Sequence, residues 1–161
     1  MKRLAIAAGA AALSVTGSAF SAVSAPASMV VTATVVNACI VVAAPLVFGN
    51  YDPTSTSDTD GTSTVGVTCT TGTPYNVRIG PGGGSTVTAR RMSFGSDTLP
   101  YALYLDSGHA LNWGQTDTVD TKAGSSLGVL QNFTVYGRIP KNAASSPAGA
   151  YTDTVTVTVS Y

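Results

Sequence analysis

The sequence predicts an all-β domain, folded as an antiparallel sandwich or, alternatively, as a closed barrel. Residues 149–161 alternate between apolar and polar side chains, which is typical of a half-buried strand. Other short β-rich segments lie between turn residues, and no segment has helical periodicity. All eight acidic residues are Asp, and Thr, Ser, Val and Gly are abundant, a composition that favours strands and turns over helices.

Residues 1–22 are predicted to be a secretory signal peptide. Met1-Lys2-Arg3 precedes a short uncharged apolar run and then small residues, which is the pattern of an export signal. The apolar run is shorter than the ~20 residues that a membrane-spanning helix needs. Cleavage is expected near Ala19 to Ala22 and would leave one domain with a net charge of −2. The sequence contains no basic patch that would indicate nucleic-acid binding.

The remaining chain is expected to consist of short strands separated by turns. The predicted strands are 28–36 continuing through 39–42, then 46–49, 64–70, 75–79, 86–94, 99–106, 127–139 and 149–161. Residues 54–62 and 140–148 are expected to be surface loops, and the Gly-rich residues 81–85 a turn. In the last strand, one face would carry Val155, Val157, Val159 and Tyr161.

Cys39 and Cys69 are the only cysteines, and we expect them to form a disulfide. Disulfides are typical of exported domains, because they form in oxidising compartments. Closing a loop of about thirty residues would stabilise the domain by roughly 3 to 4 kcal/mol through the entropy of the unfolded chain. The alternative is a pair of free buried thiols.

No constellation of residues indicates catalysis, a cofactor or a metal ligand set. His109 stands beside Asp106 and Ser107 in a turn-like stretch, where we expect an exposed imidazole rather than a catalytic triad. Residues 52–61 contain three aspartates but lack the later carboxylate of a calcium-binding loop.

Two further features of the sequence are candidate binding sites. Arg90 and Arg91 are consecutive in a predicted strand, so their side chains should point to opposite faces and not form one anion site. Trp113 is expected to anchor the core or a loop, and the alternative is that it stacks on a sugar.

The segment before the first cysteine has its own strand-like alternation. One face of it carries Ala25, Ala27, Met29 and Val31. An added strand gains specificity when alternate side chains fill pockets of its partner, although Pro26 would remove one ladder hydrogen bond. The alternative is a flexible tail. The last predicted strand has no successor, so its open edge could accept such a strand.

Seven segments in order carry a family resemblance: residues 34–39 (TVVNAC), 46–53 (LVFGNYDP), 67–70 (VTCT), 90–92 (RRM), 101–106 (YALYLD), 135–140 (VYGRIP) and 148–157 (AGAYTDTVTV). Together they resemble the spore coat protein U domain, over nearly the whole exported chain. This family includes pilin subunits of archaic chaperone-usher pili in Gram-negative bacteria.

The resemblance implies an immunoglobulin-like sandwich, residues 32–161, that lacks its final strand, with residues 23–31 as an amino-terminal donor strand. It implies a structural subunit and not an enzyme: a unit of a secreted fibre that polymerises by donor-strand complementation, in adhesion or biofilm formation. The implied partners are a periplasmic chaperone, an outer-membrane usher and other copies or related pilins. The terminal strand, with Val155, Val157, Val159 and Tyr161, would pair with the chaperone or the next subunit. The protein would pass through the periplasm to the cell surface or be secreted.

Two other functions stay open. The chain could be a self-contained secreted coat protein whose own amino-terminal strand closes its sheet. It could also be a carbohydrate-binding adhesin domain that uses Trp113 and the loops.

Overall fold

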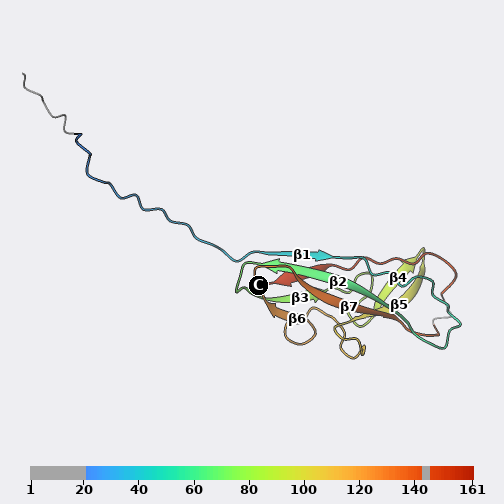
Figure 1. Cartoon of the computed structure of the whole chain (residues 1–161). Helices are drawn as coiled ribbons and strands as arrows, with labels where there is room; N and C mark the ends of the chain where they lie inside the picture. Colours follow the sequence, from blue (N-terminus) through green and yellow to red (C-terminus); the bar gives the residue numbers. More distant parts are fainter. Residues whose placement is uncertain (1–20, 143–145) are drawn as a thin grey trace, which may run out of the picture. The chain divides into compact units, whose positions relative to one another are not determined.

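The computed structural model describes residues 21–142 and 146–161, so most of the predicted signal peptide lies outside the described residues (Figure 1). The chain divides into two units, residues 1–34 and residues 35–161. Residues 21–34 contain no helix or strand, and all of their side chains are exposed. Residues 35–161 contain all the strands of the described chain. No helix in the described ranges is long and apolar enough to cross a membrane.

The strands of the second unit form two antiparallel sheets (Figure 1). The larger sheet has the order β1 (Cys39–Ala43), β2 (Thr59–Cys69), β7 (Gln131–Ile139), β5 (Asp97–Tyr104) and β4 (Arg90–Phe94). The smaller sheet has the order β6 (Lys122–Ser125), β3 (Pro74–Ile79) and β8 (Val157–Ser160). The prediction of an all-β antiparallel sandwich is confirmed.

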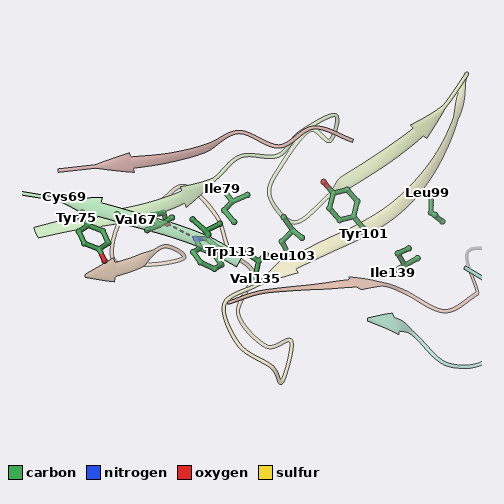
Figure 2. Packing of buried hydrophobic residues seen from close by; sticks show 12 residues of the cluster. Val67, Cys69, Tyr75, Ile79, Leu99, Tyr101, Leu103, Trp113, Val135 and Ile139 are labelled. Atoms are coloured by element: carbon green, nitrogen blue, oxygen red, sulfur yellow. Dashed lines mark hydrogen bonds between the residues drawn. The ribbon is translucent and has the colours of Figure 1, made fainter. Parts of the chain in front are cut away.

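Alternate side chains of β2, β3, β5 and β7 form the hydrophobic core (Figure 2). Its strand residues are Val65, Val67, Cys69, Tyr75, Val77, Ile79, Leu99, Tyr101, Leu103, Val135 and Ile139. The spacing of two follows from the pleat, which sends successive side chains to opposite faces of a strand. Trp113 completes the core from a loop, and its indole N–H donates a hydrogen bond to the Val77 carbonyl at 2.9 Å.

The predicted disulfide between Cys39 and Cys69 is confirmed. The two cysteines are directly opposite each other in the ladder between β1 and β2. In the described chain β1 pairs only with β2, whereas β2 pairs with both β1 and β7. The disulfide therefore adds a covalent link between the edge strand β1 and the interior of the larger sheet.

Several predicted strand boundaries were wrong. Residues 28–36 and 46–49 form no strand, because they join no hydrogen-bonded ladder in the described chain. Residues 59–62 belong to β2 and not to a surface loop, because Thr59 to Thr62 pair with β7. The terminal strand is shorter than predicted, and β6 was missed, since its sequence, Lys-Ala-Gly-Ser, lacks the usual β-branched residues.

Arg90 is buried and organises the end of β3, a role that the sequence did not reveal. Its guanidinium donates hydrogen bonds to the carbonyl groups of Ile79 (2.9 Å), Gly80 (2.9 Å), Val87 (2.8 Å) and Trp113 (2.6 Å). Burial lowers the pKa of Arg90 from its usual value. The next residue, Arg91, is exposed, so the two arginines do point to opposite faces as predicted.

Candidate assembly groove

An open groove lies between the chain that follows β1 and the chain that leads into β8. Residues 43–53 contribute to one wall and residues 146–157 to the other. The groove holds two adjoining cavities of about 520 Å³ and about 800 Å³. Both are lined by Leu46, Phe48, Met92 and Tyr151, which form the waist between them. Core residues of both sheets line the groove as well, so it opens onto the hydrophobic interior of the sandwich.

The strands nearest the groove each have a free edge. Within the described chain, β8 pairs only with β3 and β1 pairs only with β2. Cα atoms of β1 and β8 come within 8 Å of each other, but the two strands form no ladder. Each strand therefore has backbone N–H and C=O groups that an additional strand could bond.

The terminal strand presents its valines to the groove side and its threonines to solvent. Val155, Val157 and Val159 are partly buried against the core, whereas the alternating residues Thr154, Thr156 and Thr158 are exposed. Val155 and Val157 line the smaller cavity. The alternation predicts that Tyr161 shares the face of the valines, but Tyr161 lies beyond β8 and is 61% exposed.

The groove wall formed by residues 43–53 packs into a depression that two glycines leave in the larger sheet. Gly61 of β2 and Gly137 of β7 are paired in the ladder. A Cβ atom on Gly137 would lie 2.8 Å from Leu46 and 2.9 Å from Phe48, and one on Gly61 would lie 3.2 Å from Phe48. Only glycine at these positions lets Leu46 and Phe48 pack so closely on the sheet. These contacts fix residues 46–48 beside the groove without a strand ladder.

A carboxylate lies in the largely apolar lining of the smaller cavity. The Asp153 carboxylate accepts hydrogen bonds from the Tyr101 hydroxyl at 2.6 Å and from the Gly83 N–H at 2.8 Å. Burial is the main cause that raises the pKa of Tyr101 above its usual value, and the bond to Asp153 raises it further. The hydroxyl therefore stays protonated across the physiological range and acts as a donor. An occupant of this cavity would therefore meet Tyr101 and Asp153 with their hydrogen bonds already formed within the protein.

The predicted donor residues lie in the first unit of the chain. Ala25, Ala27, Met29 and Val31 are all exposed, and Met29 is 86% exposed. They lie in a segment without secondary structure. Their role as a donor strand stays a prediction.

Two sequence candidates lie elsewhere, and only the expectation about His109 needs correction. Trp113 is 1% exposed, so it cannot stack on a sugar, and the prediction of a core anchor is confirmed. His109 was expected to be exposed, but its side chain is only 9% exposed. Its ring packs edge-on against Tyr104 at 5.0 Å, and its Nε2 atom lies 3.8 Å from Asp60 Oδ1.

The aspartates of residues 52–61 are engaged in contacts within the protein. Asp60 accepts two hydrogen bonds from Arg138, at 2.7 and 2.8 Å, and Asp58 lies 3.3 Å from the same guanidinium. Asp52 accepts hydrogen bonds from the Thr54 N–H and hydroxyl. The bonds from Arg138 lower the pKa of Asp60. No group of three or more metal-ligating acidic, His or Cys side chains occurs among the described residues.

The fold and the groove define a class of protein: a two-sheet sandwich with a groove between the chain that follows its first strand and the chain that leads into its last strand. Residues 25–158 match the Spore Coat Protein U domain, and the chain belongs to this family. The predicted family is confirmed. The family is one of structural subunits and not of enzymes.

Two similar proteins place the chain within this class. It is 33% identical over 127 residues to "Protein U" of Myxococcus xanthus. The aligned region covers 71% of this chain and 70% of that protein. It also resembles a chain in the crystal structure of the CsuC–CsuE chaperone–tip adhesion subunit pre-assembly complex, from the archaic chaperone-usher Csu pili of Acinetobacter baumannii. The TM-score is 0.55 and the identity 28%, and the match covers 80% of this chain but only 40% of that one.

Proposed function

We propose that this chain is an exported structural subunit of a chaperone-usher surface fibre, which serves adhesion or biofilm formation. The observation that carries the proposal is the open groove between residues 43–53 and 146–157, flanked by two strands with free edges. An added strand would gain main-chain hydrogen bonds from those edges and would bury its alternate side chains in the two cavities. The likeness to a chain of the Csu pre-assembly complex supports the same function.

In the proposed assembly, residues 23–31 of one copy are the donor strand for the groove of another copy. Ala25, Ala27, Met29 and Val31 would face the groove. A periplasmic chaperone would occupy the groove before assembly and pair with the strand that carries Val155, Val157 and Val159. An outer-membrane usher would then exchange the chaperone for the donor strand and export the fibre to the cell surface.

The donor strand is tested by charge substitutions on its two faces. Met29→Asp would place a carboxylate in an apolar cavity, where an unpaired charge is strongly unfavourable. The matched control is Val30→Asp, because residue 30 would point away from the groove in an extended strand. We expect Met29→Asp to abolish polymers, seen as heat-labile ladders on denaturing gels, and Val30→Asp to preserve them. Equal polymer yields from the two variants would contradict the donor strand.

Deletion of residues 23–31 separates polymerisation from self-closure. A subunit that gives its strand to another copy should keep its own fold with the chaperone, accept a strand and then end the polymer. A self-contained coat protein should instead lose a strand of its own sheet and unfold. Thermal unfolding and polymer length, measured on the same deletion variant, distinguish the two functions.

A further inference from the structure

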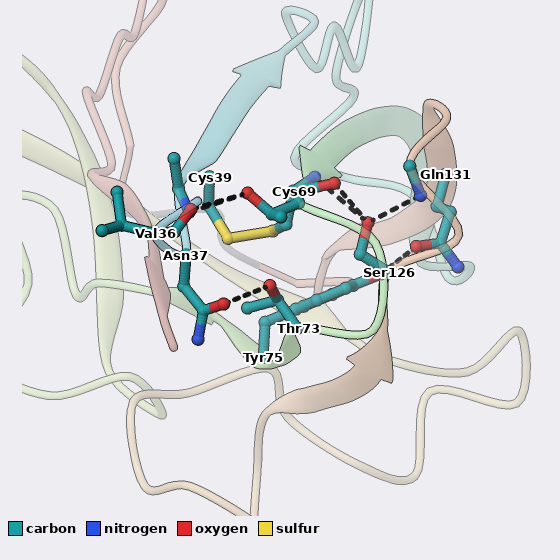
Figure 3. The surroundings of a disulfide bond; sticks show 11 residues. Val36, Asn37, Cys39, Cys69, Thr73, Tyr75, Ser126 and Gln131 are labelled. Atoms are coloured by element: carbon teal, nitrogen blue, oxygen red, sulfur yellow. Dashed lines mark hydrogen bonds between the residues drawn. A yellow bond between two sulfur atoms is a disulfide. The ribbon is translucent and has the colours of Figure 1, made fainter. Parts of the chain in front are cut away.

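The chain immediately before β1 is clasped to the turn that follows β2 (Figure 3). The Thr70 hydroxyl donates a hydrogen bond to the Val36 carbonyl at 3.2 Å and accepts one from the Ala38 N–H at 3.1 Å. The Thr70 N–H also donates to the Ala38 carbonyl at 2.9 Å. The Thr73 hydroxyl donates to the side-chain oxygen of Asn37 at 3.2 Å. We call these contacts of residues 36–38 with Thr70 and Thr73 the root clasp.

The root clasp limits how far a donated strand can lie from the body of its own subunit. It holds residues 36–38 next to the disulfide, so the fixed part of the domain begins at residue 36. If residues 23–31 are a donor strand, only residues 32–35 connect that strand to the body. The five Cα–Cα steps from residue 31 to residue 36 span at most about 18 Å. Donation would therefore bring the clasped end of one sandwich against the copy that accepts its strand.

Several exposed apolar side chains belong to the segments that form or adjoin the root clasp. Residues 126–129 lie beside residues 69–72, because the Ser126 hydroxyl bonds both the N–H and the carbonyl of Cys69, and the Ser126 carbonyl accepts from the Gly72 N–H. The exposed large side chains at this end include Val36, Ile40, Leu127 and Val129. We call these four residues the root surface.

The root surface also lacks charge. No residue in 35–40, 68–73 or 126–130 is charged. Exposed apolar patches commonly mark interaction sites, and the central parts of protein interfaces are depleted in charged residues. The short connection of residues 32–35 indicates which molecule covers this surface.

We infer that the root surface packs against the copy of this chain that accepts its donor strand, at the end of the groove from which that strand emerges. This inference rests on the proposed function. The contact is heterologous, since the root surface of one copy meets a different surface of the next, and it would repeat along the fibre. The root clasp acts as a positioning device that keeps the connection short and sets the angle between successive subunits.

Hydrogen exchange on the unsubstituted protein tests the contact directly. Amide exchange at residues 126–130 is compared between the chaperone-bound subunit and purified polymer that contains only copies of this chain. We expect exchange at least tenfold slower in the polymer. Equal exchange in the two states would overturn the inference, and protection only in the chaperone complex would assign the root surface to the chaperone and overturn it as well.

Charge substitutions test whether the contact orders the fibre. Leu127→Asp combined with Val129→Asp places two carboxylates on the root surface. The matched control combines Leu111→Asp with Val119→Asp, two other exposed apolar residues. We expect both proteins to form heat-labile ladders, and the spread of angles between successive subunits in electron micrographs to at least double only in the root-surface variant. Equal spreads would overturn the inference.

The root clasp is tested through its hydroxyl. Thr70→Val keeps the shape of the side chain but removes the two hydroxyl hydrogen bonds, whereas Thr70→Ser keeps them. We expect Thr70→Val, and not Thr70→Ser, to widen the same distribution of angles. Angle distributions of equal width from both variants would exclude a positioning role. An unsubstituted protein that forms no ladders would overturn the proposed function itself, whereas intact ladders with unprotected residues 126–130 would overturn only this inference.

Discussion

The strands β2 and β8 follow the same alternation but differ in burial. Residues 64–68 read Thr-Val-Gly-Val-Thr, and residues 156–160 read Thr-Val-Thr-Val-Ser. Val65 and Val67 are buried, whereas Val157 and Val159 are only partly buried. β2 has a neighbouring strand on both sides, and β8 has one on one side only. The difference in burial therefore arises from the neighbours of each strand and not from its own sequence.

This comparison explains how one domain can be folded and still have an open position. β2, β3, β5 and β7 supply the buried strand residues of the core, which surround Trp113. The partly buried residues Val155 and Val157 line the groove instead. An additional strand would complete the burial of these side chains with little rearrangement of the domain, because the rest of the sandwich is already folded.

The largest expected effect is a charge in the closed part of the sandwich. Val67 is 0% exposed, so Val67→Asp would bury an unpaired carboxylate. We expect a loss of roughly 4 kcal/mol or more in the free energy of unfolding and little soluble protein. The control Thr64→Asp lies on the exposed face of the same strand and should be close to neutral. Urea unfolding of the two variants makes the measurement, and similar stabilities would refute the assignment of faces in β2.

A charge on the terminal strand, at the groove, should destabilise the free subunit less than a charge at Val67. Val157→Asp places a carboxylate on a partly buried position at the groove, so we expect roughly 1–3 kcal/mol of destabilisation in the free subunit. Assembly should be lost, because the added strand would enclose the charge. Thr156→Asp, on the exposed face, is the matched control. If Val157→Asp unfolded the subunit as completely as Val67→Asp, the distinction between the two strands would be wrong.

A methyl group beneath the groove wall should have a smaller effect. Gly137→Ala would bring a Cβ atom to 2.8 Å from Leu46, and we expect this overpacking to destabilise the domain by roughly 1–3 kcal/mol. Leu46→Ala should relieve the clash, so the double variant should lose less stability than the sum of the single variants. Thermal unfolding of all four proteins measures this coupling. Additive losses would show that Leu46 does not rest on Gly137.

The smallest expected effect concerns the ion pair that joins β2 to β7. Arg138 holds the pKa of Asp60 below its usual value, so the pair stabilises the fold above the pKa that Asp60 has in the unfolded chain. That contribution is lost as the pH falls through the lower pKa of the folded state. Asp60 is partly exposed, and we expect Asp60→Asn to cost about 0.2–1 kcal/mol at neutral pH and less at pH 2. Urea unfolding at the two pH values checks the sign.

The sequence by itself determined the fold class and the covalent link. Short β-rich segments between turns predicted β3, β5 and β7. Alternation with a period of two predicted the inward face of the valines near the carboxyl terminus, because a half-buried strand needs this pattern whatever its partners. The two cysteines of a predicted exported chain were enough to predict the disulfide. The family resemblance carried the expectation of a missing strand.

Only the tertiary structure decided which alternating segments are strands and which residues form the groove. A strand is defined by its ladder, so residues 28–36 are β-rich but form no strand, whereas residues 59–62 join β2 because β7 lies beside them. Arg90, Gly61 and Gly137 matter through contacts with distant segments, which leave no periodic signal in the sequence. The same reason applies to Trp113 and His109: whether an aromatic side chain is buried depends on what the rest of the chain places over it.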